Sequence, residues 1–142
     1  MEVPQAIRTY VDLFTPSGLD TWVTTFAPDG TYSDPSTPQP VSRDGLKEYF
    51  TGFFTGFPDA RFETVGLDSI SDHVWVWRWI LHGTNTGSYR GNPTTGRSVT
   101  VPGVEFIELR GDQVYRVEGY FDRLTMLGQL GLVPGPATRS AV

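Results

Sequence analysis

The stretch "HVWVWRWILHGT", residues 73–84, constrains the fold of this chain more than any other part of the sequence. Side chains along a strand point alternately to the two faces of a sheet, so Trp75, Trp77 and Trp79 share one face. The opposite face also carries mainly apolar residues. A strand that is apolar on both faces is expected to be covered on both. The sequence therefore predicts a central strand with an aromatic face turned toward a core.

Apolar residues at helical spacing predict three helices in the first half of the chain. The first spans residues 7–14 and the second residues 19–26, and residues 28–30 then indicate a turn. The third helix follows Ser42, spans residues 43–57 and ends before Pro58.

Short runs of alternating apolar residues predict strands in the rest of the chain. They lie at residues 31–35, 60–70, 73–84, 98–109 and 113–122, and a short helix follows at 123–132. Helices followed by strands indicate an α+β domain. We expect a cone-shaped, curved antiparallel sheet packed against three N-terminal helices, with one open mouth and a short C-terminal helix. One domain over residues 1–134 and a flexible C-terminal tail over residues 135–142 are predicted.

Composition excludes several functions. A net charge of −5 with no basic run argues against nucleic acid as a partner. The chain has no cysteine and only two histidines, so no metal site is predicted. No apolar run is long enough to span a bilayer and no signal-peptide pattern is present, so we expect a cytoplasmic protein without a membrane partner. Aromatic residues make up 13% of the chain, which suits an aromatic-lined pocket.

Four motifs resemble those of the SnoaL-like polyketide cyclases, a branch of the nuclear transport factor two-like superfamily that also contains the ketosteroid isomerases. They are "FAPDGTYSDP", "GLKEYFTGFFTGFPDARFE", "GTNTGSYRGNPTTGR" and "YFDRLTMLGQLG". The resemblance covers residues 5–134. It implies the cone fold, a homodimer, a deep apolar pocket, and acid–base chemistry with no cofactor or metal.

Asp122 is the first catalytic candidate. By the resemblance, an aspartate in the "D…QLG" stretch is the proposed acid–base group for an intramolecular aldol ring closure. If the face of the strand that carries Tyr120 and Asp122 lines the cavity, apolar surroundings raise the pKa of the Asp122 carboxyl and make it a stronger base. The alternative is that Asp122 caps the helix that follows it.

Tyr10, Asp34 and Glu105 are the other catalytic candidates. The ketosteroid isomerases carry a tyrosine and, 24 residues later, an aspartate before a proline, and Tyr10 and Asp34 match this pair. Glu105 is the nearest match to the isomerases' third group, an acid that hydrogen-bonds the oxyanion. If buried, Glu105 is expected to be protonated and able to donate a hydrogen bond to an enolate. The alternatives are a core tyrosine, a turn aspartate and a strand glutamate in an ion pair.

Six residues are predicted to contact the substrate, an apolar polycyclic small molecule. They are Trp79, His82, Tyr120, Phe50, Phe53 and Trp22. The alternative for the phenylalanines is a role in the core, and for His82 a structural hydrogen bond.

Three functions follow from these observations. The first is a cyclase of secondary metabolism that closes a ring in a polyketide-type substrate through an enolate. The second is isomerisation, epoxide opening or hydroxylation in the same pocket. The Tyr10–Asp34 spacing and the lack of a histidine near Glu105 favour isomerase-like proton transfer among these. The third is a non-catalytic binding module or accessory subunit. Convergence of Tyr10, Asp34, Glu105 and Asp122 on one enclosed space would favour an enzyme.

Overall fold

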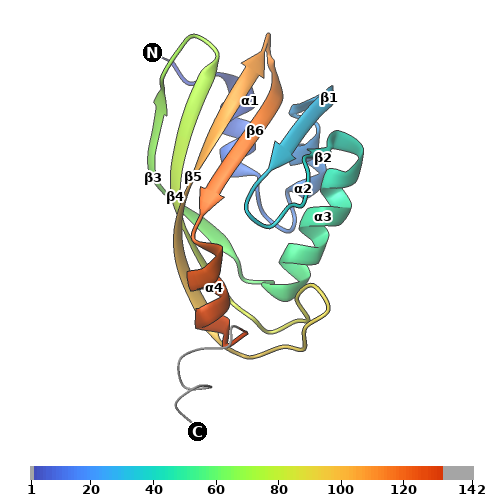
Figure 1. Cartoon of the computed structure of the whole chain (residues 1–142). Helices are drawn as coiled ribbons and strands as arrows, with labels where there is room; N and C mark the ends of the chain where they lie inside the picture. Colours follow the sequence, from blue (N-terminus) through green and yellow to red (C-terminus); the bar gives the residue numbers. More distant parts are fainter. Residues whose placement is uncertain (1, 133–142) are drawn as a thin grey trace, which may run out of the picture.

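A computed structural model describes residues 2–132 of the chain, which form one curled sheet with helices on its concave side (Figure 1). The helices are α1 (Gln5–Asp12), α2 (Leu19–Val23), α3 (Arg43–Gly56) and α4 (Arg123–Leu130). The strands are β1 (Phe26–Ser33), β2 (Val41–Ser42), β3 (Arg61–Ser69), β4 (Val74–Thr84), β5 (Ser98–Arg110) and β6 (Gln113–Phe121). Their order in the sheet is β2-β1-β6-β5-β4-β3.

The predicted fold class, α+β with a curved sheet, three N-terminal helices and a short C-terminal helix, is confirmed. Strands β3 to β6 form the expected antiparallel meander. The sheet is nevertheless mixed, because β1 pairs parallel with β6. Local sequence patterns, which predict hairpins between consecutive strands, do not predict the β1–β6 pair, since most of the chain separates these two strands.

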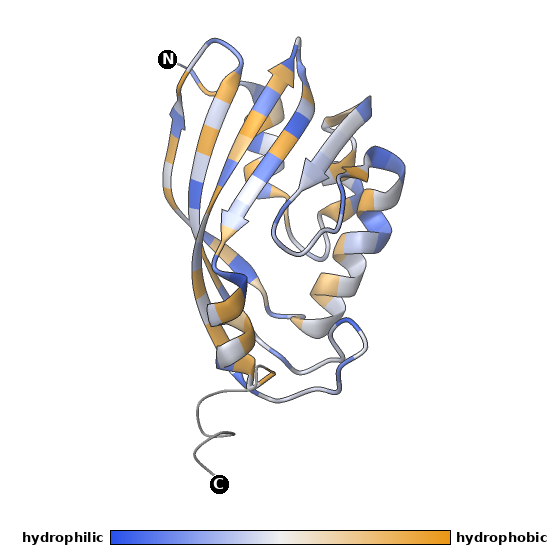
Figure 2. Ribbon diagram, in the orientation of Figure 1, coloured by the Kyte–Doolittle hydropathy of each residue, from blue (hydrophilic) through white to orange (hydrophobic). Residues whose placement is uncertain are grey.

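The aromatic face of β4 lies in the core as predicted. Trp75, Trp77 and Trp79 are buried, each with an exposed fraction of 5% or less. The expectation that both faces of β4 are covered is wrong for the described chain, because Val74, Val76 and Ile80 on the convex face are only half-buried. The same alternation is visible along β6, where apolar and polar residues follow one another (Figure 2).

The N-terminal region differs from prediction in two respects. The expected turn at residues 28–30 is part of β1, and the second helix ends at Val23 instead of continuing to Phe26. The pairing of β1 with β6 changes register between Phe26 and Thr31, so the proline and glycine of this segment produce a bulge within a strand.

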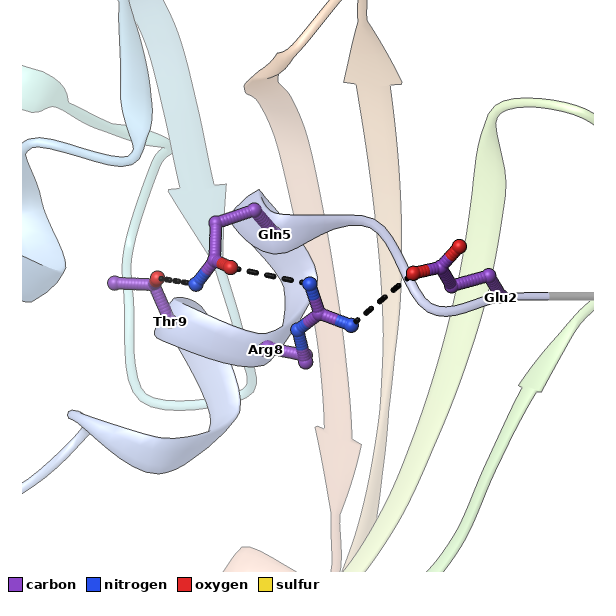
Figure 3. A network of polar contacts seen from close by, with 4 residues as sticks. All are labelled: Glu2, Gln5, Arg8 and Thr9. Carbon is purple, nitrogen blue, oxygen red and sulfur yellow. Dashed lines mark hydrogen bonds and ion pairs between the residues drawn. The ribbon is translucent and has the colours of Figure 1, made fainter.

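Exposed polar contacts join the start of the chain to α1 (Figure 3). Arg8 donates to Oε1 of Gln5 at 3.1 Å, and Nε2 of Gln5 donates to Oγ1 of Thr9 at 3.0 Å. Nη1 of Arg8 also lies 4.0 Å from Oε1 of Glu2. Solvent-exposed pairs of this kind contribute little to stability, so the position of α1 depends on its buried residues, Ile7 and Tyr10.

The predicted flexible tail, residues 135–142, and the last two residues of the predicted domain lie outside the described residues. Within residues 2–132, none of the helices is long and apolar enough to cross a membrane.

Candidate active site

A narrow apolar cavity lies between the concave face of the sheet and helices α3 and α4. Its volume is about 40 Å³, enough for a few water molecules. Most of its lining is aromatic. The lining residues are Phe14, Tyr32, Asp34, Ser36, Tyr49, Phe50, Phe53, Phe62, Trp79, Leu81, Tyr89, Arg90, Glu105, Phe121 and Met126. We call the partly exposed polar members Asp34, Ser36, Tyr49 and Arg90 the mouth of the cavity.

Glu105 provides a carboxyl group inside this cavity. It lies on the concave face of β5 with an exposed fraction of 1%. The hydroxyl of Tyr10 donates to its Oε1 at 2.6 Å, and the indole Nε1 of Trp79 donates to its Oε2 at 3.2 Å. Burial raises the pKa of Glu105 to about 7, although the hydrogen bonds from Tyr10 and Trp79 act in the opposite direction. This carboxyl therefore exchanges its proton near neutral pH.

Asp34 lies half-buried at the end of β1 and also lines the cavity. Its Oδ2 accepts a hydrogen bond from the hydroxyl of Tyr32 at 2.7 Å, and its Oδ1 accepts one from the backbone N–H of Ser36 at 2.7 Å. These bonds hold the carboxyl at the mouth of the cavity.

Gly119 on β6 leaves the space that the two carboxyl-bearing side chains share. A β-carbon built at Gly119 would lie 3.4 Å from Cγ of Glu105 and 3.5 Å from both Cβ of Asp34 and the hydroxyl of Tyr32. Glu105 and Asp34 therefore approach the same point of the sheet from two strands. The negative charge of Asp34 disfavours a second negative charge on Glu105 and so adds to the raised pKa of Glu105.

Gly103 determines where the Trp79 ring lies. The two residues are paired across β4 and β5, and a β-carbon built at Gly103 would lie 2.3 to 2.6 Å from three ring atoms of Trp79. Because glycine has no side chain, the indole lies flat against β5 and its Nε1 reaches Glu105.

Three of the four predicted catalytic residues gather at this site. Glu105 and Asp34 line the cavity, and Tyr10 lies behind Glu105 and holds it by a hydrogen bond. Tyr10 is 1% exposed and does not reach the cavity, so it acts on a ligand only through Glu105.

Asp122 is not part of the site, and the expectation of a cavity-facing Asp122 with a raised pKa is wrong. Its side chain is exposed and caps α4, where Oδ1 accepts from the backbone N–H of Thr125 at 2.9 Å and Oδ2 accepts from the Thr125 hydroxyl at 2.6 Å. The hydrogen bonds from Thr125 lower the pKa of Asp122. The alternative interpretation of this residue as a helix cap is confirmed.

The six predicted substrate contacts divide into three groups. Trp79, Phe50 and Phe53 line the cavity. Trp22 is fully buried in the core beside Tyr10 and does not reach the cavity. His82 and Tyr120 lie on the convex face of the sheet, because each is one residue out of phase with the inward positions of its strand. The expectation that these two residues face the substrate is therefore wrong. His82 pairs there with Glu63, with 2.8 Å between Nε2 and Oε1.

Sequence reasoning missed Tyr32, Tyr49 and Arg90. Tyr32 lies two residues before Asp34 on the same strand face, and Tyr49 lies one residue before the predicted Phe50. Either tyrosine could have been found by extending the predicted face to its polar members. Arg90 gives no such signal, because it belongs to the loop between β4 and β5.

Asn85 fixes the start of that loop against α3. The side chain is 1% exposed, and its Nδ2 donates to the carbonyl oxygens of Gly56 at 3.0 Å and Gly87 at 2.8 Å. Its Oδ1 accepts from the backbone N–H of Thr95 at 2.8 Å and from the Thr95 hydroxyl at 2.9 Å. This saturated amide holds both ends of the loop that carries Arg90 to the cavity.

The arrangement suits proton transfer. A buried carboxyl with a pKa near 7 can donate a hydrogen bond or a proton to a carbonyl oxygen, and a second carboxyl at the mouth can accept a proton from a neighbouring carbon. Among residues 2–132, no group of three or more metal-ligating side chains comes together.

Comparisons with known proteins identify the family of the chain and related folds. The model of the family described as SnoaL-like polyketide cyclase matches residues 4–130. A comparison of the sequence with curated proteins finds no match.

Three solved structures illustrate the fold that the chain shares. A proposed SnoaL-like polyketide cyclase from Jannaschia sp. CCS1 has a TM-score of 0.80 at 23% identity, over 94% of this chain and 99% of the other. AclR, a proposed hydroxylase from Streptomyces galilaeus, has a TM-score of 0.78 at 19% identity, over 91% and 95%. IdmH, a proposed polyketide cyclase from Streptomyces antibioticus, has a TM-score of 0.75 at 23% identity, over 89% and 96%.

Proposed function

Because the chain belongs to the SnoaL-like polyketide cyclase family, we propose that it is an enzyme that closes a ring in an apolar, carbonyl-bearing substrate by acid–base chemistry. The observation that carries the proposal is the pair of carboxyl groups that line one cavity, Glu105 fully buried and Asp34 half-buried. Different surroundings give two carboxyls different roles. Glu105 is the acid and Asp34 is the base.

The reaction begins when Asp34 takes a proton from the carbon beside a carbonyl group. The electron pair of the broken C–H bond moves toward the carbonyl oxygen, and protonated Glu105 donates a hydrogen bond to that oxygen. The enolate carbon then bonds to a second carbonyl carbon of the same molecule, whose oxygen becomes a hydroxyl by taking the proton back. Tyr10 and Trp79 are positioning residues, because each donates to Glu105 and neither proton needs to leave.

Substrate size sets a further condition. The cavity as it stands, about 40 Å³ in volume, holds a few water molecules. A substrate therefore enters only when side chains at the mouth and on α4 move aside, and Met126 of α4 is the cavity-lining residue from that helix.

The experiment is proton exchange at carbon. Incubation with 1-tetralone, an apolar bicyclic ketone, in deuterated water exchanges the protons beside its carbonyl, and nuclear magnetic resonance measures the rate. We expect Asp34→Asn to lower the catalysed rate roughly 100-fold or more. Asp122→Asn is the matched control, because it removes a carboxylate that lies outside the cavity, and it is expected to leave the rate unchanged.

The pH dependence of this exchange tests the role of Glu105. The rate is expected to fall as the pH rises above about 7, because Glu105 then loses the proton that it offers to the carbonyl oxygen. Glu105→Gln keeps a donor and is expected to remove this descending limb. A rate that depends on Asp122 and not on Asp34 would contradict the proposal.

Double-bond isomerisation is the second candidate function. It uses the same first step, after which Asp34 returns the proton to a different carbon. The favouring observation is the contact of Tyr10 with Glu105 beside Asp34, which matches the isomerase-like trio of the sequence. Exchange and double-bond migration in an unsaturated ketone that has no second carbonyl would favour isomerisation over ring closure.

A further inference from the structure

Arg90 is the only positively charged residue in the described lining of the cavity. The other charged members of that lining, Asp34 and Glu105, are acids. Arg90 is exposed, so it stands at the mouth and not in the apolar interior. The cavity therefore has one buried acid, Glu105, and a mouth that carries one acid, Asp34, and one cation, Arg90. The single cation bears on which ligands the mouth accepts.

The backbone at Arg90 is unfavourable for arginine. Tyr89 and Asn92 exchange backbone hydrogen bonds of 3.0 and 2.9 Å around a tight turn, and the two central residues have positive φ, 48° at Arg90 and 83° at Gly91. Turns with two positive φ values favour asparagine, aspartate or glycine at both central positions. Arg90 is the only non-glycine residue with positive φ within residues 2–132. A side chain kept against local preference points to a function for that side chain.

The guanidinium of Arg90 is held in place without using its N–H groups. It lies 4.3 Å above the ring centroid of Tyr49 and 5.2 Å from that of Tyr89. The ion pairs and side-chain hydrogen bonds formed within residues 2–132 do not include the guanidinium of Arg90. Its planar set of donors is therefore oriented and available to a ligand.

The hydroxyl of Tyr49 gives an independent indication of a ligand. It is buried and has no hydrogen-bond partner among the described residues, although it belongs to the cavity lining. The indole nitrogens of Trp22 and Trp75 are also unpartnered, but neither residue lines the cavity. A buried hydroxyl without a partner is costly. An acceptor oxygen brought by a ligand would remove this cost.

We propose that Arg90 and Tyr49 form a subsite for a carboxylate group on the substrate. The guanidinium supplies charge and two parallel donors, and the phenol supplies a third donor. The substrate class is then an apolar ring compound with a carboxylate at one end and a carbonyl at the other. The carboxylate stays at the mouth while the carbonyl reaches Glu105. This orientation rests on the proposed function, but the carboxylate subsite is tested without turnover.

The test compares benzoate with benzamide, which share a shape and differ in charge. Isothermal titration calorimetry at neutral pH and low salt measures the affinity of each. We expect the unmodified protein to bind benzoate roughly 10-fold more tightly than benzamide, because a carboxylate pairs with the guanidinium. Arg90→Gln is expected to remove this preference, whereas the matched control Arg61→Gln, which removes an exposed charge on β3, keeps it. Tyr49→Phe is expected to weaken both ligands, because either can accept from the phenol.

A second variant separates binding from folding. Arg90→Asn places a favoured residue in the turn, so its melting temperature is expected to equal or exceed that of the unmodified protein while the preference for benzoate is lost. Equal affinity for benzoate and benzamide, no benzoate binding at millimolar concentration, or full retention of the preference in Arg90→Gln would each overturn the subsite. Failure of the proposed function leaves a different signature, because Asp34→Asn then exchanges protons like the unmodified protein while the preference for benzoate persists.

Discussion

At the scale of single residues, the environment of Glu105 determines the chemistry. Burial favours the protonated carboxyl, and the two donors, Tyr10 and Trp79, favour the carboxylate. The balance leaves the pKa at about 7. Removing either donor therefore changes how readily Glu105 holds its proton without touching the carboxyl itself.

We predict that Tyr10→Phe raises the pKa of Glu105 above about 7, and that Trp79→Phe raises it by less, because the Tyr10 hydrogen bond lowers this pKa the more of the two. The 2.6 Å Tyr10 bond is also shorter than the 3.2 Å Trp79 bond. The chemical shift of a carbon-13-labelled Glu105 carboxyl, followed against pH, measures both effects. A pKa that falls in Tyr10→Phe would contradict this account.

Three site residues could be predicted from the sequence, because Tyr10, Asp34 and Glu105 match residues of the ketosteroid isomerases and lie on elements with a clear local pattern. Tyr10 lies on a helix stripe, Asp34 follows a strand before Pro35, and Glu105 follows from the alternation of β5. The cavity-facing position expected for Asp122 is wrong because the face of β6 that carries Tyr120 is the convex one, whereas Val117 and Phe121 on the other face turn toward the core and the cavity. Arg90 could not be predicted, since its place depends on how a long loop folds back on α3.

At the scale of elements, α4 begins at a cap and closes one end of the cavity. Asp122 accepts from the backbone and the hydroxyl of Thr125, which satisfies an N–H group that the first turn leaves without a partner. We predict that Asp122→Ala lowers the melting temperature by roughly 2–4 °C and that Asp122→Ser restores most of it. Thermal unfolding followed by circular dichroism measures both. Equal stability of the alanine and serine variants would contradict the capping role.

The close approach of β4 and β5 gives a second prediction at this scale. In Gly103→Ala the new methyl group overlaps the Trp79 ring, so the ring must move and its bond to Glu105 is lost. We expect a loss of stability of about 1–3 kcal/mol and a change in tryptophan fluorescence. Gly52→Ala is the control: a β-carbon there has nothing within 4 Å, and the helix α3 is expected to gain stability. Unchanged fluorescence in Gly103→Ala would contradict the close contact.

The sequence predicted most elements because each has a strong local period, as the tryptophans of β4 do. The order of the strands in the sheet could not be predicted in the same way. Strand β1 pairs in parallel with β6, which lies near the far end of the described chain, and no turn or periodicity indicates that pairing. The bulge near Gly30 has the sequence signal of a turn, because proline and glycine occur both where a strand ends and where it bulges.

At the scale of the whole molecule, the buried Glu105 makes stability depend on pH. Its pKa is about 7 when folded and 4.5 as a model value, so the folded protein retains a proton that the unfolded chain releases between these values. Stability from this group is complete below pH 4.5 and is lost as the pH rises through about 7. The shift corresponds to about 3 kcal/mol.

We predict that the free energy of unfolding in urea falls between pH 4.5 and 8 in the unmodified protein and falls less in Glu105→Gln. The lowered pKa values of Asp29, Asp59 and Asp122 act at lower pH, where their stabilisation is lost as the pH falls, so they leave this window undisturbed. Identical slopes in the two proteins would contradict the burial argument. The homodimer implied by the family resemblance stays a prediction, which sedimentation equilibrium can test.

The pairing of β1 with β6 has a consequence for how the protein is made. Tyr10 and Glu105, which bond at 2.6 Å, are 95 positions apart in the chain, and β1 gains its parallel neighbour only from residues near the end of the sheet. Contacts between distant segments form slowly and cannot form before both segments exist. On the ribosome, we therefore expect the aromatic side chains of α1, α2 and α3 to stay exposed until β6 has emerged. Closure of the sheet and assembly of the acid pair then follow the emergence of β6 as a single late event.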